Sequence, residues 1–163
     1  MTENLGTLSS EGGTRSVRFV RVFDVSVEEL WDAITDPDRI ARWMRTEQMT
    51  FERHVGGAVR YRWGGTDEAI GTVKVFDPPH AVEYTWREGS ESSIVRFELR
   101  PLAQGVELTL HHWNLGSDQA TGVGAGWHAH LDFLNAVLGD EVFDFDRRFN
   151  DLLPRYEVSA AQL

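Results

Sequence analysis

The sequence predicts an α+β domain in which one antiparallel sheet is followed by a long helix near the C-terminus. Three observations support this prediction. Apolar and polar residues alternate with a period of two in seven segments, and short turns containing Gly, Pro or Asp separate most of them. An apolar stripe with helical spacing then runs from Trp127 to Leu138. Because such short turns join neighbouring strands as hairpins, the sheet is expected to be antiparallel.

The first expected elements are one strand and two short helices. Side chains of alternating polarity predict a strand over residues 15–24. Ser26 and Glu29 then form a capping box, and the apolar residues that follow lie on one face of a helix. Asp36 can cap a second helix, with Pro37 in its first position, where no N–H is needed.

Six further strands, a long helix and a short helix are expected after these elements. The strands are predicted at residues 49–54, 58–63, 69–76, 80–87, 93–100 and 106–113. A glycine-rich loop over residues 116–126 leads into the long helix, which ends at Gly139. A short helix beginning near Phe145 is expected to stop at Pro154.

Composition limits the class of protein. The 163 residues carry 16 Lys and Arg against 26 Asp and Glu, a net charge of −10, which argues against binding to nucleic acid. The chain has no cysteine and no apolar run long enough for a membrane span. We therefore expect a cytoplasmic protein with a flexible lead-in over residues 1–14, a folded domain over 15–140 and an extension over 141–163.

Four segments carry a resemblance to a known family: residues 23–43, Val55-Gly56-Gly57, residues 75–86 and residues 126–131. Together they resemble the SRPBCC (START-like, birch-pollen-allergen-like) superfamily, and within it the activator of heat-shock-protein-90 ATPase homologue (AHSA-type) domain. The resemblance implies a helix-grip fold with about seven curved antiparallel strands wrapped on the last helix. It also implies a cavity, with functions that range from lipid carriage to polyketide cyclisation.

A small hydrophobic or aromatic ligand is expected in a cavity between the sheet and the last helix. The candidate lining residues have inward parity on the strands or lie toward the core face of that helix. They are Tyr61, Trp63, Tyr84, Trp86, Phe97, Leu110, His112, Trp127, His130 and Leu134. Buried phenol and indole groups need hydrogen-bond partners, which a ligand can supply.

The histidines do not predict a metal site. His111 and His112 are adjacent on a strand and must point to opposite faces. His128 and His130 lie about 200° apart around a helix. His130 is expected at the edge of the core face, as a polar anchor of the cavity, and His128 is expected to form a surface pair with Asp132. No metal or cofactor is predicted.

Three functions are compatible with these residues. The first is non-catalytic binding of a small hydrophobic molecule. The second is an enzyme of the cyclase or hydrolase type, for which His112, His130 and Tyr84 are the available acid–base groups. The third is a co-chaperone-like interaction module with a filled core, which would bind a chaperone. A homodimer is compatible with each of them, and no catalytic residue is assigned.

Overall fold

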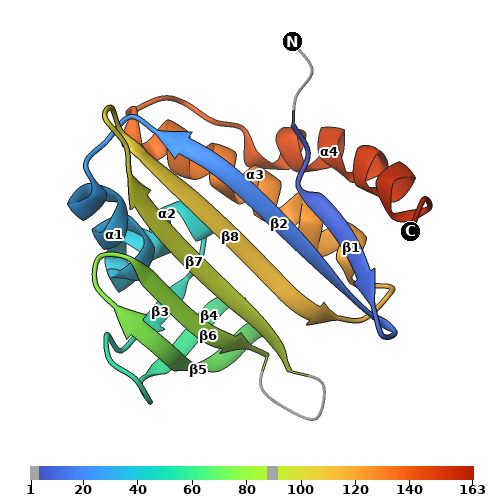
Figure 1. Cartoon of the computed structure of the whole chain (residues 1–163), viewed down its shortest axis with the longest axis horizontal. Coiled ribbons are helices and arrows are strands. Elements are labelled where there is room, and N and C mark those ends of the chain that lie inside the picture. The colour runs from blue at the N-terminus through green and yellow to red at the C-terminus, as the bar shows by residue number, and fades with distance from the viewer. Residues whose placement is uncertain (1–3, 88–91) are drawn as a thin grey trace. The chain divides into compact units, whose positions relative to one another are not determined.

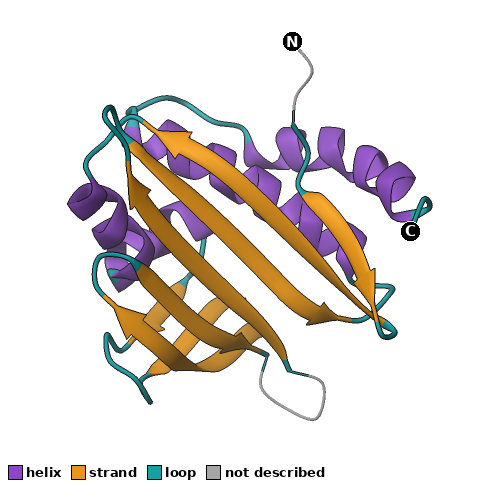
Figure 2. Ribbon diagram, viewed as in Figure 1, coloured by secondary structure: helices purple, strands orange, loops and turns teal. Residues whose placement is uncertain are grey.

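A computed structural model describes residues 4–87 and 92–163 (Figure 1). The described residues form eight strands and four helices, shown in orange and purple in Figure 2. The strands are β1 (Thr7–Glu11), β2 (Thr14–Phe23), β3 (Gln48–Phe51), β4 (Ala58–Gly64), β5 (Asp67–Asp77), β6 (Ala81–Trp86), β7 (Ser93–Pro101) and β8 (Val106–Leu115). The helices are α1 (Val27–Thr35), α2 (Pro37–Met44), α3 (Ala120–Leu138) and α4 (Phe145–Ala160).

The strands form one sheet in the order β1-β2-β8-β7-β6-β5-β4-β3. The pairs β1–β2, β3–β4, β4–β5, β5–β6 and β6–β7 are antiparallel hairpins. This element order confirms the predicted α+β class and the helix-grip arrangement of elements. No helix in the described part of the chain is long and apolar enough to cross a membrane.

Contacts divide the chain into two compact units. The terminal unit comprises Met1–Phe19 and His111–Leu163, and the central unit comprises Val20–Leu110. In the central unit, most residues with inward parity on β4, β6 and β7 are buried, as Val59, Val82 and Val95 illustrate, while Trp63 and Trp86 near the strand ends are half-buried. The period-two pattern therefore identified the core face of these strands correctly.

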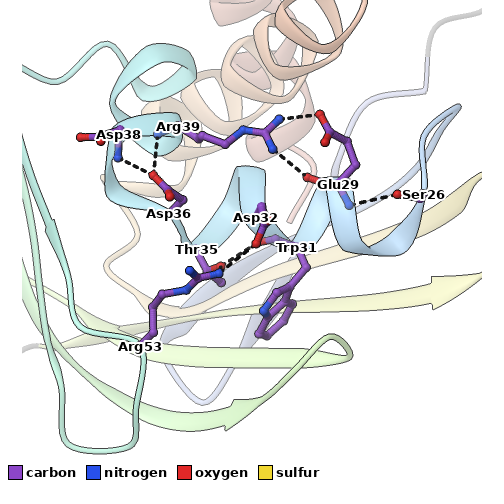
Figure 3. A network of polar contacts seen from close by, with 9 residues as sticks. All are labelled: Ser26, Glu29, Trp31, Asp32, Thr35, Asp36, Asp38, Arg39 and Arg53. Atoms are coloured by element: carbon purple, nitrogen blue, oxygen red, sulfur yellow. Dashed lines mark hydrogen bonds and ion pairs between the residues drawn. The ribbon is translucent and has the colours of Figure 1, made fainter.

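The two short helices of the central unit begin as the sequence predicts. Ser26 Oγ accepts a hydrogen bond from the backbone N–H of Glu29 at 3.1 Å and so caps α1. Asp36 Oδ1 accepts from the N–H groups of Asp38 and Arg39 at 2.9 and 3.2 Å and caps α2 (Figure 3). Each cap satisfies donors that a helix start would otherwise leave unpaired.

Ion pairs link these helices to each other and to the segment after β3. Arg39 contacts the Glu29 carboxylate at 2.7 Å, and one nitrogen of Arg53 reaches both Asp32 and Thr35 at 3.0 Å (Figure 3). The carboxylates are about half exposed, so each pair stabilises the fold by less than about 1 kcal/mol. The network links α1 to α2 and to Arg53, and this structural role needs no catalytic explanation.

The terminal unit contains β1, the part of β2 that pairs with it, and the packed helices α3 and α4. Gly6 N–H donates to the hydroxyl of Tyr156 at 2.7 Å, which joins the N-terminal segment to α4. A Cβ atom at Gly124 would lie 2.8 Å from the Tyr156 ring. The tyrosine therefore packs directly on the backbone of α3, at a point where only glycine fits.

The N-terminal segment of this unit differs from the sequence prediction. Residues 7–11 form β1, although residues 1–14 were expected to be flexible. Leu8 is its one buried side chain, and the turn at Gly12-Gly13 has positive φ at both residues, which favours a hairpin. One buried apolar position is too few to give a visible strand period.

Both C-terminal helices are longer than predicted. α3 begins at Ala120, so Gly122, Gly124 and Gly126, which were expected in a loop, lie inside it. α4 continues to Ala160 with Pro154 inside it. Burial of Leu152 and Tyr156 on either side of the proline holds α4 in place, and tertiary packing thus overrides the local signals. In the central unit, by contrast, β3 is shorter than predicted, because it ends at Phe51 and not at residue 54.

Candidate functional site

The central unit contains a cluster of aromatic side chains on strands that follow one another in the sheet. The aromatic cluster consists of Phe51, Tyr61, Trp63, Tyr84, Trp86 and Phe97. Its ring centroids lie 4.8 to 6.5 Å apart, within the range of direct aromatic contact. The five members that the sequence analysis selected are therefore brought together.

Small residues on β5 let tyrosines from β4 and β6 meet. β5 lies between these two strands, and its register places Ala69 opposite Tyr61 and Val73 opposite Tyr84. Residues directly opposite each other share a face of the sheet. Ala69 and Gly71 offer almost no side chain on that face, so the tyrosine rings can lean over β5 toward each other.

The two tyrosine hydroxyls form a buried hydrogen bond. Tyr61 Oη and Tyr84 Oη lie 2.6 Å apart, and both side chains are almost completely shielded from solvent. Burial raises the pKa of both phenols well above the ordinary value of 10.0. Both groups therefore keep their protons throughout the physiological pH range.

The tryptophan end of the cluster is partly exposed. Trp63 and Trp86 are half-buried, and the Trp63 indole N–H donates to the carbonyl of Met44 at 2.9 Å. Arg87 is exposed, and its guanidinium lies 6.0 Å from the Trp63 ring centre. It is held there by a 3.0 Å hydrogen bond to the carbonyl of Glu68. The cluster thus runs from two buried phenols to two accessible indoles.

One buried hydroxyl lies close in sequence to this tryptophan end. Thr46 Oγ1 is inaccessible to solvent and has no hydrogen-bond partner within the described residues. It follows Met44 by two residues and precedes Glu47, whose N–H donates to the carbonyl of Arg62 at 2.8 Å. A buried hydroxyl without a partner costs free energy.

The terminal unit pairs two further predicted residues. The indole N–H of Trp127 donates to His112 Nδ1 at 2.9 Å, and both side chains are buried. Burial, and secondarily the neighbouring His111, lowers the pKa of His112 to about 3. His112 is therefore neutral near pH 7 and carries its proton on Nε2, since Nδ1 accepts a hydrogen bond.

The structure overturns the expectation for one of the two histidines of α3, His128. His130 is half-buried and contacts the Phe145 ring at a centroid distance of 4.4 Å. His128, expected in a surface pair, is only 1% exposed and lies 2.8 Å from the Tyr156 hydroxyl. Asp132 lies 3.6 Å from His128 but bonds Arg148 at 2.7 Å. The surface-pair expectation fails because α4 covers this side of α3.

Leu110 and Leu134 are both fully buried, on β8 in the central unit and on α3 in the terminal unit. Sequence reasoning missed Phe51, which packs edge-on against Tyr84 at 5.7 Å. The period-two alternation of β3 was the signal that could have found it. No group of three His, Asp or Glu side chains suited to a metal ion occurs in the described ranges.

The element order and the aromatic-lined sheet define a helix-grip domain of the α+β class. The chain belongs to the family described as "Activator of Hsp90 ATPase homolog 1-like protein", whose model matches residues 24–139. This finding confirms the resemblance seen in the sequence. Among curated proteins, none matches the sequence.

Solved structures with the same fold come from several bacteria. CalU16 from Micromonospora echinospora is 26% identical and has a TM-score of 0.75, with 97% of each chain covered. Protein EF2215 from Enterococcus faecalis is 20% identical with a TM-score of 0.76, covering 94% of this chain and 91% of its own. DynU16, from the dynemicin biosynthetic locus, is 23% identical with a TM-score of 0.68, covering 76% of this chain and 47% of its own.

Proposed function

We propose that this protein binds a small hydrophobic or aromatic molecule on the aromatic cluster and does not transform it. The observation that carries the proposal is the hydrogen-bonded hydroxyl pair of Tyr61 and Tyr84 inside an otherwise apolar cluster. The half-buried indoles of Trp63 and Trp86 adjoin this pair and offer flat faces to a ligand. The absence of cysteine supports a cytoplasmic location for this role.

A purely structural role explains the hydroxyls less well. Phenylalanine would fill the same volume at both positions, and replacing both partners of a buried hydrogen bond by apolar groups is close to neutral in stability. A protein with phenylalanine at both positions should therefore be about as stable as one with the two tyrosines. A bound molecule that forms a hydrogen bond with the pair would explain why both hydroxyls are present.

The ionisation of the candidate acid–base groups supports binding over catalysis. A general acid or base works best when its pKa lies near the operating pH. Burial lowers the pKa of His112 to about 3 and raises that of Tyr84 well above its ordinary value. Neither of these two groups exchanges a proton readily near pH 7, which leaves the cyclase or hydrolase alternative with His130 alone among the three candidates.

The expected affinity is modest. A ligand that buries roughly 300 Å² of apolar surface gains about 7 kcal/mol, and association costs at least about 4 kcal/mol. The difference is at most about 3 kcal/mol, which corresponds to a dissociation constant in the millimolar range for apolar burial alone. An assay must therefore detect weak binding and locate it on the protein.

Nuclear magnetic resonance of the indole N–H groups meets both needs, because the chain has six tryptophans. We expect added 2-acetylnaphthalene to shift the Trp63 and Trp86 signals in a saturable way. The Trp113 indole, on the other unit beside His111, is the internal control and should not move. Shifts that avoid Trp63 and Trp86, or no saturable shifts in the folded protein, would overturn the proposal and favour the interaction module.

A further inference from the structure

The Tyr61–Tyr84 pair has one hydroxyl proton that the hydrogen bond between the two residues does not use. Two phenols carry two O–H protons, and a single hydrogen bond between them consumes one. Within the part of the chain that the structure describes, the 2.6 Å contact is the one hydrogen bond that either hydroxyl makes. The hydroxyl that accepts this bond therefore holds a proton that reaches no protein acceptor.

Solvent at the protein surface does not satisfy this proton, because Tyr61 and Tyr84 are 1% and 0% exposed. Both phenols also stay protonated, since burial raises the pKa of each. A buried donor without an acceptor is costly, whereas the lone pairs of an acceptor tolerate being left partly unused. The pair is thus a donor in need of an acceptor.

We propose that the ligand presents a neutral acceptor oxygen, such as a ketone or quinone carbonyl, to this spare proton. The inference deepens the proposed function and rests on it. It identifies the ligand class as an aromatic or polycyclic carbonyl compound, with its carbonyl at the tyrosines and its ring system on the indoles.

Ligands of other chemistry fit this site less well. An alcohol or amine that donated to a tyrosine oxygen would leave the spare proton unpaired. A carboxylate would be buried without a counter-charge, which costs several kcal/mol. Arg87, a cation at the cluster, lies at the exposed tryptophan end and already binds the Glu68 carbonyl and Asp67. A neutral carbonyl avoids both costs.

Two isosteric probes test the inference. In 2-isopropenylnaphthalene a C=CH₂ group replaces the C=O of 2-acetylnaphthalene, so the two differ mainly in the acceptor. Dissociation constants for both probes are measured on the wild-type protein and on Tyr61→Phe/Tyr84→Phe. We expect the affinity ratio of ketone to alkene to fall about tenfold in the double variant, because it has lost the donor. Comparing ratios cancels the different water solubilities of the probes.

Further variants guard against a trivial result. In each single variant one hydroxyl proton survives, so at least one of Tyr61→Phe and Tyr84→Phe should retain the wild-type ratio. Tyr156→Phe removes the third tyrosine hydroxyl, which lies in the terminal unit, and should leave the ratio unchanged. Circular dichroism confirms that each variant is folded.

The outcomes separate this inference from the proposed function. An equal ratio in wild type and double variant, with both probes bound at Trp63 and Trp86, would refute carbonyl recognition and leave ligand binding standing. Failure of both probes to bind the folded wild-type protein would refute ligand binding and the inference with it. A ratio that falls equally in Tyr156→Phe would show a general loss of structure and also refute the inference.

Discussion

Mild acid should destabilise this protein through His112, a group that the folded state cannot easily protonate. Its imidazole is fully buried and accepts the Trp127 indole N–H at Nδ1. The pKa of His112 is about 3 in the folded protein, against an ordinary value of 6.5 that applies to the unfolded chain. The unfolded chain therefore binds one proton more between these two values.

The size of the effect follows from proton linkage. Above pH 6.5 both states hold His112 neutral, and its contribution to stability is complete. As the pH falls toward 3, the free energy of unfolding decreases by up to about 1.4 kcal/mol per pH unit for this one proton. Between pH 6.5 and 5, where carboxylates still contribute little, the loss amounts to about 1 to 2 kcal/mol.

Urea unfolding followed by circular dichroism at several pH values measures this slope. His112→Asn removes the titrating group, and its amide oxygen can still accept from the Trp127 indole. We expect this variant to be less stable than wild type at pH 7 but to lose stability more slowly between pH 6.5 and 5. His111→Asn, on the same strand and half-exposed, should keep the wild-type slope. Equal slopes in wild type and His112→Asn would refute the assignment.

Two further predictions concern the terminal unit. In α3, Gly122→Ala should stabilise the protein by about 0.5 to 1 kcal/mol, since a Cβ there meets no atom within 4 Å and alanine favours helix. Gly124→Ala should instead destabilise it, because the added Cβ lies 2.8 Å from the Tyr156 ring. Thermal unfolding of both variants decides this, and equal shifts would contradict the packing described. Tyr156→Phe should cost about 1 to 3 kcal/mol, because it leaves the buried Gly6 N–H without its 2.7 Å acceptor. Hydrogen exchange at Gly6 should then accelerate, and unchanged protection would show that this bond contributes little.

The sequence predicted best where the structure depends on local patterns. Alternation alone placed Tyr61, Tyr84 and Phe97 on one face of the sheet, and the capping box at Ser26 placed the start of α1. Both are short-range rules, since strand parity and helix caps require only a few neighbouring residues. The contact between the two tyrosine hydroxyls was less visible, because it also requires the small side chains of β5 between them.

Predictions failed where a distant segment determines the local structure. The glycines at the start of α3 are poor helix formers, yet Tyr156 packs against Gly124 and the segment is helical. His128 has the spacing of a surface ion pair, but α4 buries it. Because α4 extends through Pro154, the sequence underestimated how much of α3 it covers. One misplaced helix end therefore accounts for several misplaced side chains.

The hydroxyl of Tyr156 has a practical consequence for anyone who shortens this chain. The family match spans residues 24–139, yet Gly6, Arg15 and Tyr156, which tie β1, β2 and α4 together, lie outside it. A fragment trimmed to the matched residues would lack Tyr156. His128 would lose its contact with the Tyr156 hydroxyl, and Gly124 would lose the ring that packs on it. The segment that matches the family model is thus shorter than the segment that a stable protein requires.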